Sequence, residues 1–156
     1  MFLRGTYTDT VTASLFGFNN PVTTFVVMTT ILPSCTLSAT PLAFGAYTGL
    51  QRAASSTVTV TCTNTTAWSV GLDAGQASGA SVTTRRMTGP AGATLAYGLY
   101  LDNAHTRQWG ITINVDTAAG IGSGLPQLLA VYGLIPAGTY GRPGLYADTI
   151  TATVSY

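Results

Sequence analysis

Apolar and polar residues alternate along most of this chain of 156 residues, and this period of two is the feature that most constrains its fold. The alternation is clearest in Tyr146–Tyr156, where only Asp148 interrupts an apolar face. The apolar face carries Tyr146, Ile150, Ala152, Val154 and Tyr156, and the polar face carries Thr149, Thr151, Thr153 and Ser155. Successive side chains of a β-strand point to opposite faces, so the pattern predicts a strand with one buried face.

Similar runs follow one another along the chain, with Gly, Pro, Asn and Ser between them. They are Thr23–Leu32, Thr57–Cys62, Trp68–Leu72, Leu95–Leu101, Ile111–Val115 and Leu128–Ile135. Short strands separated by turn residues are typical of an all-β sandwich or barrel. No stretch has a convincing helical period, and Ala104–Trp109 can form one helical turn at most.

The composition excludes several classes of protein. Charged residues make up only 7% of the chain, hydrophobic residues make up 46%, and the formal net charge is +1. Such a chain should bury a core, and it lacks the basic face that nucleic-acid binding requires. We interpret the one basic pair, Arg85 and Arg86, as the solvated edge of a loop. No window has the roughly 18 apolar residues of a membrane-spanning helix, and residues 1–6 show no signal peptide.

The chain has two cysteines, Cys35 and Cys62, each next to a predicted strand. A disulfide between them would close a loop of about thirty residues and stabilise the fold by about 3 kcal/mol. It would also imply an oxidising compartment, and hence a natural N-terminus upstream of Met1 that carries the export signal. The alternative is a pair of unpaired buried thiols.

Seven blocks occur in a fixed order: PSCTLSATPLAFGAY (Pro33–Tyr47), TVTVTC (Thr57–Cys62), VGLDAG (Val70–Gly75), RRMTG (Arg85–Gly89), LAYGLYLDNAHTRQWG (Leu95–Gly110), VYGLIPAG (Val131–Gly138) and LYADTITATVSY (Leu145–Tyr156). With the cysteines in place, this order resembles the spore coat U domain. That family includes the subunits of archaic, Csu-type chaperone–usher pili of Gram-negative bacteria. The resemblance covers about Val22 to Tyr156.

The resemblance implies an immunoglobulin-like (pilin-type) β-sandwich that lacks or borrows its final strand. In such pilins a periplasmic chaperone lends a strand, which the N-terminal extension of the next subunit later replaces; this is a known form of β-augmentation. The implied partners are neighbouring pilus subunits, the periplasmic chaperone and the outer-membrane usher, and the implied route is through the periplasm to a cell-surface fibre. The implied acceptor-edge strand carries Ile150, Ala152, Val154 and Tyr156, the last matching the family's terminal aromatic residue.

The two ends of the chain repeat each other. GTYTDTVTASLF (Gly5–Phe16) matches GLYADTITATVS (Gly144–Ser155) at six identities, all at one offset of 139 residues. Tandem repetition of a domain produces such an offset, whereas chance likeness of Thr-rich strands is the alternative. We therefore expect residues 1–19 to be the remnant of the last strand of an upstream repeat domain plus a linker. Residues 20–156 form the spore coat U or pilin-like domain.

Residues 20–33 are a candidate donor strand or the domain's own first strand. In pilins the segment before the first cysteine is donated, and the apolar side chains that would enter a groove here are Phe25, Val27 and Ile31. A register slip of one residue would present Val22, Val26, Met28 and Leu32 instead. The strand could act between chains, or within one chain by completing the upstream domain.

Residues that could support catalysis or metal binding are few. A Ser-His-Asp triad would need His105, the one histidine, with Asp102 or Asp116 to orient it, and no serine is marked as activated. We interpret His105 as an exposed turn residue and expect no enzyme activity, cofactor or metal. The aromatic residues Trp68, Tyr97, Tyr100, Trp109 and Tyr132 could instead form a carbohydrate-binding face. The competing interpretation places Trp68 and Tyr97 in the core and Trp109 over a loop.

The function that the sequence favours is a structural subunit of a bacterial surface fibre, assembled by donor-strand complementation and supporting adhesion and biofilm formation. It could be the C-terminal pilin domain of a two-domain tip subunit. The alternative function is a self-contained coat or carbohydrate-binding module that uses surface aromatic residues.

Overall fold

The computed structural model describes residues 3–17 and 21–156 and is built almost entirely of β-strands. Its elements are β1 (Gly5–Ser14), β2 (Val22–Ile31), β3 (Cys35–Ala39), β4 (Arg52–Cys62), β5 (Ala67–Leu72), β6 (Arg85–Thr88), the short 3₁₀ helix η1 (Pro90–Gly92), β7 (Thr94–Tyr100), β8 (Ala118–Ile121), β9 (Gln127–Ile135) and β10 (Ala152–Ser155). Among the described residues, no helix is long and apolar enough to cross a membrane.

Residues from 35 onwards form a body of two sheets. One sheet has the strand order β3-β4-β9-β7-β6, and the other has the order β10-β5-β8. All strand pairs are antiparallel. The all-β sandwich that the alternation predicts is therefore present.

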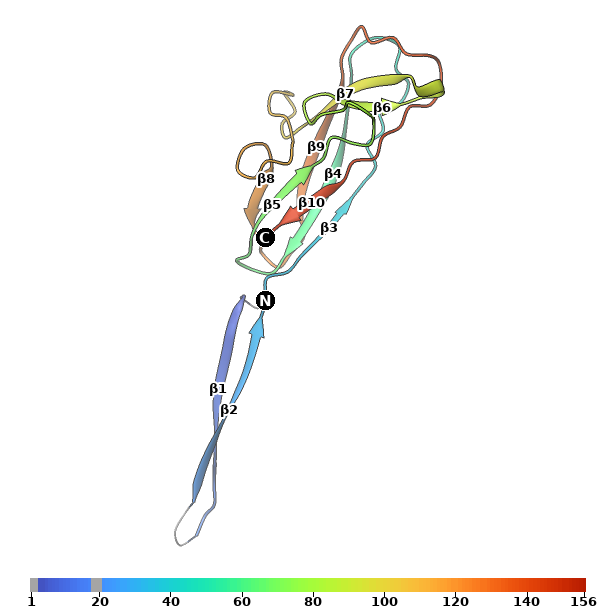
Figure 1. The fold of residues 1–156 in the computed structure, drawn as a ribbon. Helices are drawn as coiled ribbons and strands as arrows, with labels where there is room; N and C mark the ends of the chain where they lie inside the picture. Colours follow the sequence, from blue (N-terminus) through green and yellow to red (C-terminus); the bar gives the residue numbers. More distant parts are fainter. Residues whose placement is uncertain (1–2, 18–20) are drawn as a thin grey trace.

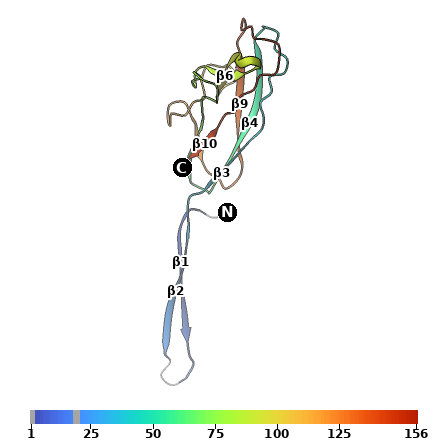
Figure 2. The ribbon, with the colours of Figure 1, turned by 45° about the vertical axis from the view of Figure 1, so that its right-hand side comes forward.

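The strands β1 and β2 form a separate antiparallel hairpin. Figures 1 and 2 show it extending away from the body as a long two-stranded ribbon. Every side chain of β1, and all of β2 except Ile31, is exposed. Asn19, Asn20 and Pro21 are residue types that favour a turn between the two strands, and the first two lie outside the described residues.

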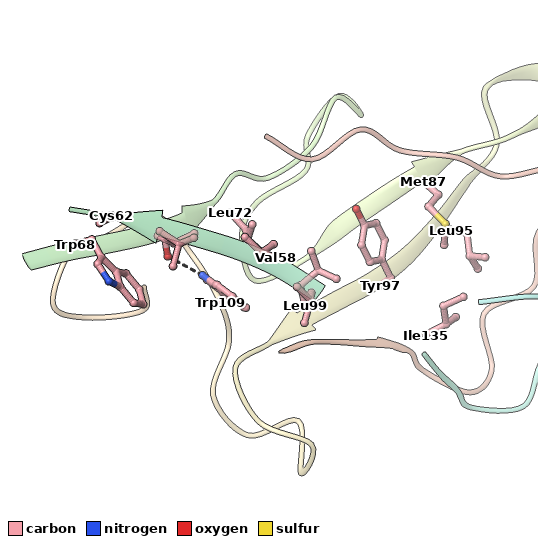
Figure 3. Packing of buried hydrophobic residues seen from close by; sticks show 13 residues of the cluster. Val58, Cys62, Trp68, Leu72, Met87, Leu95, Tyr97, Leu99, Trp109 and Ile135 are labelled. Carbon is pink, nitrogen blue, oxygen red and sulfur yellow. Dashed lines mark hydrogen bonds between the residues drawn. The ribbon is translucent and has the colours of Figure 1, made fainter. Parts of the chain in front are cut away.

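The core lies between the two sheets of the body. Figure 3 shows buried residues from both, among them Val58, Leu72 and Leu99. Trp109 is fully buried and its indole Nε1 donates a hydrogen bond of 2.8 Å to the Val70 carbonyl. The ring therefore lies inside the core. The interpretation that places Trp109 over the Arg107–Gly110 loop is wrong.

A disulfide joins Cys35 on β3 to Cys62 on β4, at positions directly opposite each other. It pins the first strand of the body to its neighbour. The glycine-rich turn after β8 packs beside it, because a Cβ on Gly122 would collide with the Thr63 carbonyl oxygen and the Cys62 side chain. The glycine-rich stretch thus serves a close backbone approach.

Five of the six shorter predicted runs are strands, but the strand predicted at Ile111–Val115 is wrong. That segment is a tight loop in which the amides of Val115 and Asp116 both donate to the Thr112 carbonyl. The Asp116 carboxylate accepts from the Thr112 amide, and Asn114 has a left-handed φ of 64°. These local bonds compete with sheet pairing and leave Ile111, Ile113 and Val115 exposed.

Arg85 is fully buried, so its interpretation as part of a solvated loop edge is wrong. Its guanidinium donates to four backbone carbonyls, those of Leu72, Asp73, Val82 and Trp109, at 2.6 to 2.8 Å. Burial lowers the pKa of Arg85, while nearby Tyr97 and Asp73 oppose that shift. The side chain ties β6 to the end of β5 and to the loop before Gly110.

We predict that Arg85→Met destabilises the body by about 3 kcal/mol or more, because four carbonyls lose their donor in a buried place. Urea denaturation of the oxidised protein measures this. The matched control is Arg142→Met, which removes an exposed guanidinium. Equal stabilities for the two variants would contradict the structural role of Arg85.

Candidate functional site

A groove of about 1150 Å³ opens between the two sheets along one side of the body. This exceeds the range of about 300–1,000 Å³ that is usual for small-molecule pockets. Its floor is the hydrophobic core itself, including Val58, Leu72, Leu99, Val131 and Ile135. The core is therefore incompletely covered on this side.

One wall of the groove is the C-terminal segment. Tyr146, Asp148, Ile150, Ala152 and Val154 are half-buried, and the residues between them are exposed. The inward-facing set is the one that the alternation predicts, except that Tyr156 is exposed, and it includes the misfit Asp148. In Figure 1 this red segment runs down one side of the body to the C-terminus.

The backbone of this wall is only half paired. The Asp73 amide donates to the Thr151 carbonyl, whereas the Leu72 amide turns away to the Gly110 carbonyl. Hydrogen-bonded pairs alternate in an antiparallel ladder, so Thr153 and Ser155 also face β5. The backbone groups of Ile150, Ala152 and Val154 consequently point to the opposite, open side.

The facing wall is the segment Ala39–Gly49, which follows β3. Leu42 and Phe44 are half-buried against the core, and Phe44 packs edge-on against Tyr97 with 6.0 Å between ring centroids. Hydrogen bonds close one end of the groove. The Tyr47 hydroxyl donates to the Pro136 carbonyl, and the Gly138 amide donates to the Gly49 carbonyl.

Asp148 is held by a polar network at the groove wall. Its Oδ2 accepts a hydrogen bond of 2.7 Å from the Tyr97 hydroxyl, and its Oδ1 accepts from the amides of Gln76 and Thr149. Burial and the bond to Asp148 raise the pKa of Tyr97 well above its usual value. This network fixes the C-terminal segment to β7 and explains a carboxylate on an apolar face.

The predicted acceptor residues divide into two groups. Ile150 and Ala152 line the groove and Val154 packs against the core, whereas Tyr156 is 61% exposed. The donor candidates Phe25, Val27 and Ile31 lie on β2, away from this groove. Sequence reasoning missed the Ala39–Gly49 wall and the Tyr97–Asp148 pair. Asp148 was visible only as an interruption of the alternation.

The structure argues against the carbohydrate-binding face that the sequence offers as an alternative site. Trp68, Tyr97 and Trp109 are at most 6% exposed, so these three rings cannot form a carbohydrate platform. His105 lies in a turn, as expected, but it is half-buried and packs edge-on against Tyr100, so its interpretation as exposed is wrong. The Asp102 carboxylate accepts from the amides of Thr106 and Arg107 and thereby shapes that turn. These bonds, with that from Thr106 Oγ1, lower the pKa of Asp102.

Comparison with known proteins identifies the family. Residues 22–153 match the Spore Coat Protein U domain family. The chain belongs to this family. Protein U of Myxococcus xanthus is 37% identical over 87 residues, which are 55% of this chain and 48% of Protein U. The match thus spans about half the length of that relative. The family match over residues 22–153 confirms the resemblance seen in the sequence.

A solved structure has the same fold. It is the CsuC–CsuE chaperone–tip adhesion subunit pre-assembly complex from the archaic chaperone–usher Csu pili of Acinetobacter baumannii. The match has a TM-score of 0.64 at 19% identity and covers 88% of this chain and 45% of that chain. The prediction of a pilin-type β-sandwich is therefore confirmed for this spore coat U domain.

The Tyr97–Asp148 pair predicts how the domain responds to alkaline pH. Because the folded state raises the pKa of Tyr97, the unfolded chain releases a proton near pH 10.0 that the folded chain retains. This contribution to stability is complete below that pH and is lost as the pH rises further. The chain contains no lysine, so no ammonium group titrates in the same range.

We expect the free energy of unfolding of the native protein to fall above pH 10.0, and to fall less steeply in Tyr97→Phe. At neutral pH the variant should lose about 1.5–3 kcal/mol, the value of a hydrogen bond to a carboxylate. Urea midpoints at a series of pH values measure both effects, with Tyr140→Phe, at an 87% exposed position, as control. An unchanged slope in Tyr97→Phe would refute the coupling.

Proposed function

We propose that this chain is a structural subunit of a bacterial surface fibre of the chaperone–usher type, and that an added strand completes its groove. The observation that carries the proposal is the half-paired backbone of Ile150, Ala152 and Val154 beside an uncovered core. Unpaired backbone groups at a sheet edge readily pair with another strand. An added strand would satisfy them and place alternate side chains in the groove.

The same groove suits a sequence of partners. A periplasmic chaperone would cover it first, the outer-membrane usher would receive the complex, and a neighbouring pilus subunit would supply the final strand. The subunit would thus pass through the periplasm to the cell surface and there support adhesion and biofilm formation. Its role is structural, not enzymatic.

Two comparisons support this proposal. The chain belongs to the spore coat U family, and the matched solved structure is described as a chaperone bound to a tip adhesion subunit. We propose that the present body is the C-terminal pilin domain of such a tip subunit. A carbohydrate-binding module has less support, because the three largest candidate rings are buried.

A peptide with the sequence Val22–Leu32 tests the groove. Refolding the oxidised protein with excess peptide should give a one-to-one complex with a raised melting temperature. Stabilisation by a bound ligand reaches about 2.7 kcal/mol at about 100 times Kd. Light scattering and thermal denaturation measure the stoichiometry and the shift.

A matched pair of variants localises the binding. Ala152→Phe fills the groove and should abolish the shift, whereas Thr153→Phe, on the exposed face of the same strand, should retain it. A stable monomer that ignores the peptide in every form would mean that the fold completes itself, and the fibre-subunit proposal would lose its mechanism.

A further inference from the structure

One face of the β1–β2 hairpin, here called the apolar face, carries Val11, Phe25 and Val27 together with Asp9. The opposite, threonine-rich face also carries Val22, Val26 and Met28. Val11 lies opposite Phe25, and Asp9 lies opposite Val27. Residues directly opposite in an antiparallel pair project to the same side, so these four share a face with Tyr7. The other face of β1 carries Thr6, Thr8, Thr10, Thr12 and Ser14. The register therefore places Phe25 and Val27 on the same side of the hairpin as Val11.

Strand β1 repeats the local conformation of the C-terminal segment as well as its sequence. Gly5 and Gly144 have φ angles of 148° and 150°, a region that favours glycine. The Tyr7 hydroxyl donates to the Leu3 carbonyl at 2.7 Å, as the Tyr146 hydroxyl does to the Arg142 carbonyl at 2.9 Å.

The acidic residues repeat as well. In both Asp9 and Asp148, Oδ1 accepts a hydrogen bond of 2.8 Å from the amide of the following threonine. All of these pairs keep the offset of 139 residues. The repeat thus extends from the six identities to the local backbone and side-chain geometry of those residues.

Strand β2 occupies the side of β1 that corresponds to the open side of β10. The Leu15 amide donates to the Pro21 carbonyl, so by alternation Ala13 and Val11 also bond to β2. At the offset of 139, these residues correspond to Val154, Ala152 and Ile150. Their counterparts are the residues whose backbone faces the open groove.

We infer that β1 and β2 are the last strand and the completing strand of a preceding domain of the same fold in the same polypeptide. In that preceding domain, β1 would take the place that the C-terminal segment takes in the present body. Strand β2 would take the place of the strand that completes the present groove. The inference rests on the proposed function, because it assumes that bodies of this fold are completed by an added strand. It assigns Phe25 and Val27 to a groove within one chain.

A second copy of the present body cannot take up the hairpin. Residues 144–155 already occupy the position that β1 would need beside β5. A body that accepts both strands must lack both, and a domain whose last strand is β1 is such a body. Its hydrophobic floor would cover the apolar face of a hairpin that is otherwise only marginally stable in water.

One consequence concerns the direction of assembly. A chain that uses β2 to complete its own preceding domain has no β2 to donate to another subunit. It accepts a strand through the groove of residues 33–156 and therefore ends a fibre. A position at the end of a fibre agrees with the tip position proposed above. It is argued here from the pairing of β1 with β2 and not from the groove.

The coding DNA upstream of Met1 gives the first test. In the body, Tyr97 precedes Asp148 by 51 residues (148 − 97) and donates to it. We expect an in-frame preceding domain with a tyrosine at the same distance before Asp9. An upstream sequence without a further domain of this pattern would overturn the inference.

Two variants of the full polypeptide give the second test. Phe25→Asp, on the apolar face of β2, should abolish or lower one of two calorimetric transitions and leave that of residues 33–156 unchanged. Val26→Asp, on the opposite face, should leave both transitions in place. If Phe25→Asp instead leaves both calorimetric transitions unchanged and suppresses self-polymerisation, β2 acts between chains and the inference is wrong.

Locking the hairpin separates this inference from the proposed function. Thr12 and Thr24 lie opposite each other on the threonine-rich face, so Thr12→Cys with Thr24→Cys can form a disulfide between β1 and β2. We expect the locked and unlocked proteins to bind the Val22–Leu32 peptide equally and to show the same oligomeric state. Polymers that form only in the unlocked protein would refute donation within the chain. Loss of peptide binding in both would refute the groove itself.

Discussion

The C-terminal segment leaves one edge of its sheet half paired beside an uncovered part of the core. Backbone groups of Ile150, Ala152 and Val154 face away from β5, towards a groove floored by the core. A buried polar backbone group without a partner costs free energy, as does an apolar surface left open to water. A single added strand relieves both costs, because its backbone pairs with the edge and its alternate side chains cover the core.

Several features hold the groove open and in register. The disulfide between Cys35 and Cys62 fixes the first strand of the body to its neighbour. Arg85 joins β6 to the carbonyls of Leu72 and Asp73 at the end of β5 and to the Trp109 carbonyl beside them. The Tyr97–Asp148 bond anchors the C-terminal segment to β7. The two walls of the groove are thus set by covalent and polar contacts, which do not depend on a strand being present.

Much of the fold was predictable because long alternating runs leave few alternatives to paired strands. The alternation in Tyr146–Val154 predicted which residues face inwards. The same rule failed at Ile111–Val115, because Asp116 and Asn114 stabilise a local turn whose apolar side chains happen to alternate. It also missed Arg85, since a charged pair in sequence is usually solvated and only tertiary structure supplies four carbonyl acceptors. The groove was predicted through the family resemblance, but its Ala39–Gly49 wall has no distinctive periodic pattern.

Amide hydrogen exchange in the oxidised monomer shows whether this edge is open. We expect the amides of Ile150, Ala152 and Val154 to exchange much faster than those of Thr153 and Ser155, which face β5. Binding of the Val22–Leu32 peptide should then protect the fast set. Equal, strong protection of all five amides in the free monomer would show that this edge is already paired, and would contradict the proposal.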